Sequence, residues 1–345
     1  MKTLSRFRLI FFALGLALSA AAQPGPSSSP ASQPAPQPDS SAPPASRPAA
    51  QPAFTVIPLG VRGGLDESNL SSYLVAAGNG MDYICLDAGT LYAGIRKAIA
   101  NGVLPPPIAT VLCSDIKDYF ISHPHLDHVA GLIINSPDDS SKNIYGLASC
   151  LKVLQEKYFS WQSWANFGDE GEKPQLKKYH YVTMQPDEEI SADRTSLHVR
   201  AFSLSHGNPY ESTAFLVRNG EDCLLYFGDT GADSVEHTDK MQNVWRSVSP
   251  LVQAGRLKAI FIEVSFPNEQ PVRSLFGHLT PALLNQELKA LAALTGETAL
   301  RGLPVVITHR KPSGDQEERI RRELLADNPL GVKLIFPEQG RKLSF

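Results

Sequence analysis

The sequence predicts an α/β fold built on β-strands, with helices between some of them. Short apolar runs rich in Val, Ile, Leu, Phe and Tyr recur along the chain, and each is typical of a strand. Longer segments with helical spacing lie between some of these runs. The main histidine and aspartate residues follow strand-like runs directly. Together these observations predict a rigid sheet that collects functional side chains at one rim.

The strand signal is spread over the whole region after residue 53. The runs cover residues 54–60, 72–78, 82–89, 119–123, 197–206, 213–220, 223–229, 259–266, 305–309 and 333–337. Helical spacing is clearest over 147–158 and 281–294. The second helix has Thr280 as its expected N-cap, Pro281 at its first position, and an apolar face formed by Leu284, Leu288 and Leu291.

The first 22 residues have the order of a secretory signal peptide. Lys2, Arg6 and Arg8 precede an apolar run over 9–18, and the small residues of 19–22 include an A-x-A cleavage pattern. The apolar run is shorter than the roughly 20 residues that span a bilayer. We expect cleavage near Ala22 and a periplasmic or secreted protein without stable membrane insertion; an uncleaved anchor is the alternative.

Residues 23–53 are mostly Pro, Ser, Ala and Gln, a composition that cannot bury enough apolar surface to fold. We expect a disordered linker there and a single catalytic domain over 54–345. Loss of the three positive charges of the signal peptide from the formal net charge of −3 leaves −6. This acidic balance argues against a nucleic-acid partner.

The four cysteines follow no metal-binding spacing. Export would permit disulfides, and the sequence leaves their pairing open. Cys85 and Cys223 lie in apolar strand-like runs, where buried free thiols are expected. The other two cysteines are Cys113 and Cys150.

Residues 121–132, ISHPHLDHVAGL, predict a metal site. His123 and His125 are two residues apart, so both can face one ion. Asp127 and His128 come from the turn that follows and can face a second ion. Imidazole and carboxylate ligands together suit zinc, manganese or iron, with zinc the first choice. Burying such a polar cluster without a ligand would cost about 2–7 kcal/mol for each unpaired group.

The pattern HPHLDHVAGL resembles the signature of the class II cyclic nucleotide phosphodiesterases, a family of the metallo-β-lactamase superfamily. Further similarity lies in GGLDESNLSSYLV, LDAGT, INSP, NIYGLASCLKVL, FGDTGAD, IEVSF and GHLTP, and it extends over nearly all of residues 55–310. The resemblance implies a four-layer αββα sandwich with two divalent transition-metal ions. It also implies a small cyclic nucleotide as substrate.

Carried over by position, the resemblance implies two ligand sets joined by Asp229. One set is completed by His123, His125 and His206, and the other by Asp127, His128 and His309. Asp127 is also expected to take part in catalysis. Asp87 and Thr90 in LDAGT are expected to form a structural turn behind the ions.

Two further residues are expected to take part in catalysis. Glu263 ends the run AIFIE and His278 precedes the helix at 281, and the resemblance implies a relay between them. A buried Glu263 is expected to orient and charge His278, which then donates a proton. For the substrate base, Trp164 and Phe167 are expected to stack and Asn166 to make a polar contact.

Together with the resemblance, these residues imply hydrolysis of cyclic AMP, or of cyclic GMP, to the 5′-monophosphate by a two-metal mechanism. Three alternatives stay open: an exported β-lactamase or lactonase, an RNA 3′-processing nuclease, and a non-enzymatic periplasmic nucleotide sensor. The metal, the preferred nucleotide and the oligomeric state cannot be read from the sequence.

Overall fold

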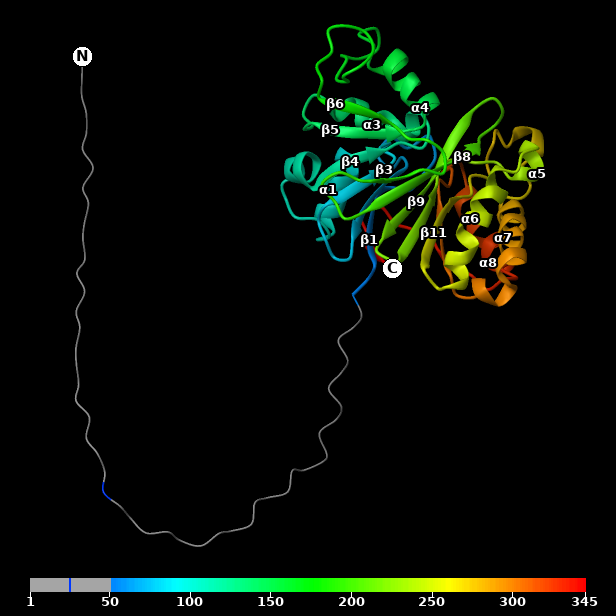
Figure 1. Cartoon of the computed structure of the whole chain (residues 1–345). Helices are drawn as coiled ribbons and strands as arrows, with labels where there is room; N and C mark the ends of the chain where they lie inside the picture. The colour runs from blue at the N-terminus through cyan, green and yellow to red at the C-terminus, as the bar shows by residue number, and fades with distance from the viewer. Residues whose placement is uncertain (1–24, 26–50) are drawn as a thin grey trace, which may run out of the picture. The chain divides into compact units, whose positions relative to one another are not determined.

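The computed structural model describes Gly25 and residues 51–345. The predicted signal peptide over 1–22 lies outside the described residues, as does the predicted linker except for Gly25 and residues 51–53. From residue 51 onward the chain forms two β-sheets with helices on their outer faces (Figure 1). Within these residues, no helix is both long enough and apolar enough to cross a membrane.

The first sheet has seven strands in the order β14-β1-β2-β3-β4-β5-β6. The pairs β14–β1, β1–β2 and β2–β3 are antiparallel, whereas β3 to β6 run parallel. Its strands are β1 (Phe54–Gly60), β2 (Ser72–Ala77), β3 (Tyr83–Leu86), β4 (Ile116–Phe120), β5 (Lys142–Gly146), β6 (Tyr179–Thr183) and β14 (Leu343–Ser344).

The second sheet also has seven strands, in the order β13-β12-β11-β10-β9-β8-β7. Strands β7 to β10 are antiparallel, and β10 to β13 run parallel. The carboxyl ends of β10, β11 and β12 therefore meet at one edge. The strands are β7 (Glu189–Ser191), β8 (His198–Ser205), β9 (Glu211–Asn219), β10 (Asp222–Phe227), β11 (Leu257–Glu263), β12 (Pro304–Thr308) and β13 (Lys333–Ile335).

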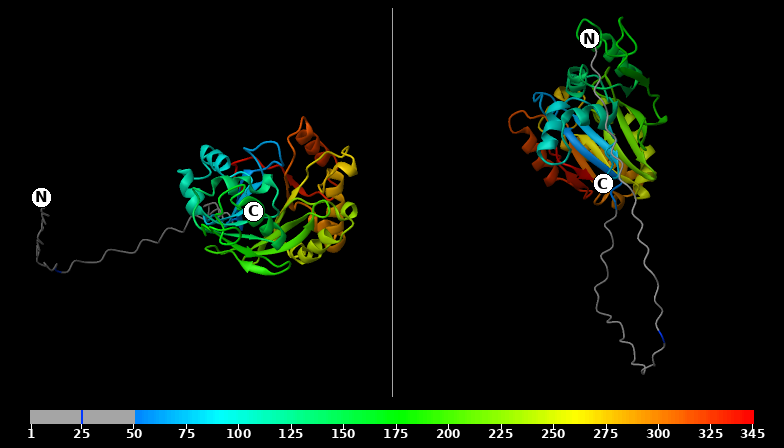
Figure 2. Two further views of the ribbon diagram at one scale, coloured as in Figure 1. Left: turned by 90° about the horizontal axis from the view of Figure 1, so that it is seen from above. Right: turned by 90° about the vertical axis from the view of Figure 1, so that its left-hand side faces the viewer.

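The helices form the two outer layers, as Figure 1 and the left view of Figure 2 show. On the first sheet lie α1 (Tyr92–Ala100), α3 (Leu126–Asn135) and α4 (Ala148–Val153), the last continued by a π-helical turn over Leu154–Tyr158. On the second lie α6 (Lys240–Gln253), α7 (Pro281–Thr295) and α8 (Gln316–Ala326). The short helices α2 (Ile108–Thr110) and α5 (Asp233–Glu236) lie in connecting segments.

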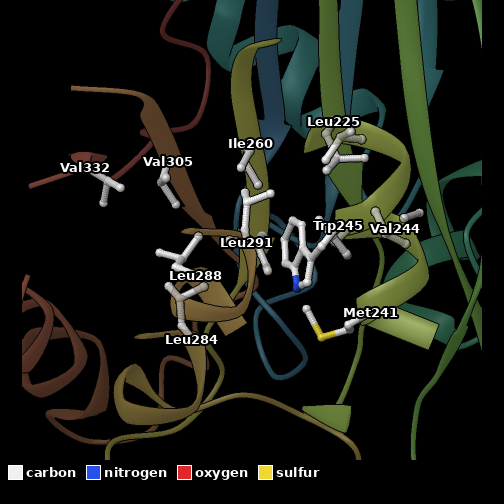
Figure 3. Close-up of a cluster of buried hydrophobic side chains, with 14 of the residues drawn as sticks. Leu225, Met241, Val244, Trp245, Ile260, Leu284, Leu288, Leu291, Val305 and Val332 are labelled. Carbon is white, nitrogen blue, oxygen red and sulfur yellow. The ribbon is translucent and has the colours of Figure 1, made fainter. Parts of the chain in front are cut away.

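Three buried apolar clusters hold these layers together. One joins the facing surfaces of the two sheets, and one lies between each sheet and its helices. Figure 3 shows the cluster beneath α6 and α7, where Trp245 packs among leucine and valine side chains. The indole N–H of Trp245 donates to Glu287 Oε2 at 3.0 Å, so this buried polar atom is paired. The predicted αββα sandwich is confirmed.

All the predicted strand runs are strands, although four further strands, β5, β6, β7 and β14, were not predicted. The helix at 281 begins as expected, and the Thr280 hydroxyl accepts a hydrogen bond from Leu283 N. The expected turn after His125 is instead the start of α3. The four cysteines carry free thiols, and Cys85 and Cys223 are buried as predicted.

Candidate active site

The predicted metal ligands lie together at one edge of the two sheets, and we call them the ligand cluster. Their donor atoms form two groups, and within each group these atoms lie within 4.8 Å of one another. Asp229 belongs to both groups, as predicted. The first group adds His123, His125 and His206, and the second adds Asp127, His128 and His309.

The motif at 123–128 bends around the start of α3. His123 follows β4, and His125 is the extended residue just before the helix, with φ −66° and ψ 148°. Asp127 and His128 belong to the first helical turn. Because the chain turns from strand to helix within this motif, its side chains reach both ligand groups.

The remaining ligands arrive from the second sheet. His206, Asp229 and His309 follow the carboxyl ends of β8, β10 and β12. His309 has a positive φ of 52°. Its ring packs so closely on Gly63 that a Cβ there would lie 2.2 Å from His309 Cε1. Glycine at this position therefore leaves the space that the imidazole occupies.

Asp229 lies at the centre of the cluster. Its Oδ1 is 3.3 Å from His128 Nε2, while its Oδ2 is 3.1 Å from His309 Nε2 and 3.6 Å from His123 Nε2. Burial alone would raise the pKa of this carboxyl, but the surrounding imidazoles, His309 first, hold it well below its usual range. Asp229 is therefore an ionised acceptor facing both groups.

Outer hydrogen bonds fix the rings of His123 and His128. The Nδ1 atom of His128 lies 2.8 Å from Asp87 Oδ2, and the Nδ1 atom of His123 lies 3.0 Å from Ser122 Oγ. Asp87 also accepts from the Ser122 hydroxyl at 2.8 Å and from the Tyr226 hydroxyl at 2.6 Å. The expected turn at Asp87 thus orients ligands from behind.

The rings of His206 and His309 are held in the same way. His206 Nδ1 donates to the carbonyl of Gly277 at 2.9 Å, and His309 Nδ1 lies 2.9 Å from Ser265 Oγ. With Nδ1 engaged, each of these histidines presents Nε2 to the cluster. Sequence reasoning did not identify Ser122 or Ser265, because a single serine beside a strand end carries no distinguishing signal.

The ligand cluster is better explained as a binding site for cations than as a polar core without ligands. The Nε2 atoms of His123 and His128 are buried and have no hydrogen-bond partner among the described residues. Leaving such an atom unpaired costs about 1–3 kcal/mol. Ligation of these nitrogens by a transition-metal ion would remove that cost, and the mixed imidazole and carboxylate set suits zinc, manganese or iron.

His278 and Glu263 form a buried pair beside the cluster, as predicted. His278 Nδ1 lies 2.8 Å from Glu263 Oε1, and the Ser265 hydroxyl donates to Glu263 Oε2 at 2.7 Å. The His278 ring lies 4.8 Å from that of His206 and 5.2 Å from that of His309. His278 therefore borders both ligand groups.

The charge of this pair differs from the sequence expectation. Burial raises the pKa of Glu263 to about 7 and lowers the pKa of His278 to about 4. Desolvation disfavours the charged form of each group and outweighs the attraction that would charge His278. When the Glu263 carboxyl donates to Nδ1, the imidazole hydrogen lies on Nε2.

The residues predicted to contact the base do not reach the cluster. The Trp164 indole donates to Ser136 Oγ at 3.0 Å, just beyond the end of α3 that lies opposite His128. Asn166 is fully buried, and its amide donates to the carbonyls of Glu170 and Glu172. Phe167 packs against the core beneath α4. In the structure these side chains stabilise the segment around residues 164–172 and do not contact the ligand cluster.

Comparison with known proteins finds relatives along most of the chain. The relatives include the 3′,5′-cyclic-nucleotide phosphodiesterase of Aliivibrio fischeri, which is 43% identical over 85% of this chain and 93% of the relative. Another is the cAMP/cGMP-dependent 3′,5′-cAMP/cGMP phosphodiesterase A of Dictyostelium discoideum, which is 30% identical over 84% of this chain and 80% of the relative.

Solved structures support the fold. Unliganded yeast PDE1 superposes with a TM-score of 0.76 at 22% identity, covering 85% of this chain and 100% of that one. The metallo-beta-lactamase fold protein YhfI from Bacillus subtilis superposes with a TM-score of 0.57 at 17% identity, covering 85% of this chain and 99% of that one. Residues 108–340 match the family of class-II cAMP phosphodiesterases. By this match and by its curated relatives, the chain belongs to the class II cyclic nucleotide phosphodiesterase family.

Proposed function

We propose that this protein is a metal-dependent 3′,5′-cyclic-nucleotide phosphodiesterase that hydrolyses cyclic AMP to 5′-AMP. The observation that carries the proposal is the position of His278 between two ligand groups that share Asp229. A site for phosphodiester hydrolysis needs both charge stabilisation at phosphorus and a proton donor for the leaving oxygen. The curated relatives named above carry the same activity in their names.

The two groups would each hold one divalent ion, with zinc expected first and manganese or iron as alternatives. Such ions, when bound, supply Lewis-acid stabilisation of the phosphoryl oxygens and lower the pKa of water. The chain itself contributes orientation. The outer partners fix the imidazole rings and thereby direct their Nε2 atoms inward.

His278 is proposed as the general acid. Water attacks phosphorus and gives up one proton to the solvent, and the bond from phosphorus to the ribose 3′-oxygen breaks. That oxygen takes a proton from His278 Nε2, while the proton of the Glu263 carboxyl moves to His278 Nδ1, and solvent then returns a proton to Glu263. Glu263 holds Nδ1 and therefore keeps the ring turned toward the leaving group. Ser265 contacts Glu263, His278 and His309, so it ties the proton donor to the ligand cluster.

Export is a separate part of the proposal. It rests on the charged, apolar and small-residue order of residues 1–22, followed by the linker over 23–53 and the catalytic domain over 54–345. Mature protein from a periplasmic fraction should begin at or near Gln23 by intact-mass analysis. Protein that keeps Met1 and is found in the membrane pellet would indicate an uncleaved membrane anchor instead of export.

A substrate panel tests the activity. It contains 3′,5′-cyclic AMP, 3′,5′-cyclic GMP, 2′,3′-cyclic AMP, a cephalosporin and a homoserine lactone. We expect turnover of the 3′,5′-cyclic nucleotides with 5′-AMP as the product from cyclic AMP. Turnover of only the cephalosporin or the lactone would overturn the proposal, and binding without turnover would favour a nucleotide sensor.

A further inference from the structure

A cavity of about 720 Å³ opens beside the ligand cluster. Pockets for small ligands fall in the range of roughly 300–1,000 Å³, so this volume is large enough for a nucleoside. One wall comes from α4, and the other comes from the loop between β8 and β9, the segment after α5 and the start of α6. We call it the side cavity.

The side cavity lies next to the ligand cluster. Pro124 lies between two ligand histidines, Ser205 directly precedes His206, and both line the cavity. Tyr210 also lines it, and its ring lies 5.6 Å from that of His125. The Tyr210 side chain is 61% exposed, so one face of an aromatic ring is available at the junction.

The net negative charge of the side cavity disfavours the phosphoryl group. Its charged lining consists of Glu211, Glu236 and Lys240, which leaves a formal charge of −1 if His237 is neutral. Lys240 is already held, since its ammonium lies 3.7 Å from Glu211 and donates to Ser203 Oγ at 2.9 Å. An acidic wall repels a phosphate, so the uncharged part of a nucleotide suits this space.

Glu236 offers a specific acceptor within this wall. Its Oε2 accepts from the Ser205 hydroxyl at 2.7 Å and from Gly207 N at 3.0 Å, so the carboxylate is held on both sides of His206. Among the described residues, none donates to Glu236 Oε1. Oε2 is thus engaged in positioning, whereas Oε1 lies beside Gly231 and keeps its capacity to accept a hydrogen bond.

We propose that the side cavity is the nucleoside subsite, in which Tyr210 packs against the base and Glu236 accepts a hydrogen bond from the ribose 2′-hydroxyl. The inference rests on the proposed function, because it assumes that the phosphodiester lies at the ligand cluster. The carbon that carries the 2′-hydroxyl is bonded to the carbon that carries the 3′-oxygen of the cyclic phosphate. This short separation matches the position of Glu236 beside His206. The base then extends along Tyr210 into the cavity.

Product inhibition tests the stacking contact without requiring turnover of a cyclic nucleotide. The reporter is hydrolysis of bis(p-nitrophenyl) phosphate by the metal-loaded full chain, and the inhibitor is 5′-AMP. Tyr210→Ala should raise the inhibition constant about 5- to 150-fold, the range expected for one aromatic–base contact. Tyr210→Phe should keep it within about twofold, because the ring remains.

Two controls make this result specific. Inorganic phosphate should inhibit Tyr210→Ala and the unchanged protein to within about twofold, because phosphate lacks a base. Trp164→Ala should leave the inhibition constant of 5′-AMP within about twofold, since its ring lies at the far end of α3. A large effect of Trp164→Ala with none of Tyr210→Ala would overturn the assignment.

A pair of substrates tests Glu236. The unchanged protein should show a KM for 2′-deoxy cyclic AMP about 10-fold or more above that for cyclic AMP, as for loss of a hydrogen bond to a charged group. Glu236→Gln should reduce this ratio to about 2 or 3, because an amide accepts more weakly than a carboxylate. An unchanged ratio would remove Glu236 from the subsite.

The tests separate the two proposals. If the unchanged protein turns over no cyclic nucleotide while 5′-AMP inhibition depends on Tyr210, the subsite is supported and the proposed function is overturned. If cyclic AMP is hydrolysed while Tyr210→Ala leaves the 5′-AMP inhibition constant unchanged, only the subsite is overturned.

Discussion

The ligand cluster and the side cavity lie next to each other but are built in different ways. The cluster is largely buried, and four of its histidines have Nδ1 fixed by a neighbouring group. The side cavity is lined partly by a loop that carries the exposed Tyr210. We infer that the cluster determines the chemical step and that the cavity determines which nucleoside is accepted. Substitutions in the two regions should therefore affect kcat and KM differently.

The largest expected loss follows Asp229→Ala. This change removes the carboxylate common to both ligand groups, so turnover of cyclic AMP and of bis(p-nitrophenyl) phosphate should both fall far more than the roughly 100-fold typical of an outer partner. Asp222→Ala is the matched control, because Asp222 lies at the start of the same strand in a surface ion pair with Lys258. Retention of activity in Asp229→Ala would remove Asp229 from the site.

His278→Ala should give the next largest loss and should depend on the leaving group. Turnover of cyclic AMP should fall about 10²- to 10⁴-fold, the usual contribution of a positioned proton donor. The loss on bis(p-nitrophenyl) phosphate should be much smaller, because p-nitrophenolate leaves as a stable anion. Glu263→Gln should show a weaker form of the same bias. Equal losses on both substrates, at unchanged metal content, would assign His278 to phosphoryl binding instead.

A smaller loss is expected from Ser265→Ala. The Ser265 hydroxyl contacts Glu263, His278 and His309, so its removal loosens a ligand and the proton donor together. Metal affinity or kcat should fall about 10- to 100-fold, as for other outer partners. Ser247→Ala provides the control, since Ser247 lies exposed on α6. Equal activity of the two variants would show that the contacts of Ser265 are dispensable.

Asn166→Ala should change turnover least. It removes an amide that holds the carbonyls of Glu170 and Glu172 and the N–H of Gly168. The free energy of unfolding should drop by about 1–3 kcal/mol, since buried backbone groups lose their partners. Urea unfolding measures this loss, while the KM for cyclic AMP should not change. A raised KM for cyclic AMP with an unchanged free energy of unfolding would instead show that Asn166 contacts the substrate.

The difference between the two regions also explains what the sequence could predict. The motif at 123–128 is local, and His206, Asp229 and His309 each follow an apolar strand, so the ligand positions can be read along the chain. The side cavity has no such signal. Its main contacts come from Tyr210 in a short loop and from Glu236 at the end of a four-residue helix.

The positions where the sequence expectation and the structure differ have a similar physical cause. Trp164 and Asn166 have the composition of a base-binding segment, yet their polar atoms are satisfied by groups distant in sequence or within their own loop. Strand β5 was not predicted because it begins with Lys142 and Asn143, which leaves only Ile144 and Tyr145 as an apolar run. In the structure, Lys142 is buried in an ion pair with Asp139, which also accepts from the Tyr119 hydroxyl. Tertiary contacts of this kind leave no local pattern.

The central claim is that Asp229 joins two ligand groups, each able to hold one ion. Metal analysis of purified protein tests it most directly, using the unchanged chain, His125→Ala, His309→Ala and Asp229→Ala. We predict about two transition-metal ions per unchanged chain, as two-metal sites require. Each histidine variant should retain about one, and Asp229→Ala should retain fewer than either. A single ion in the unchanged chain, with no loss in His309→Ala, would contradict the account.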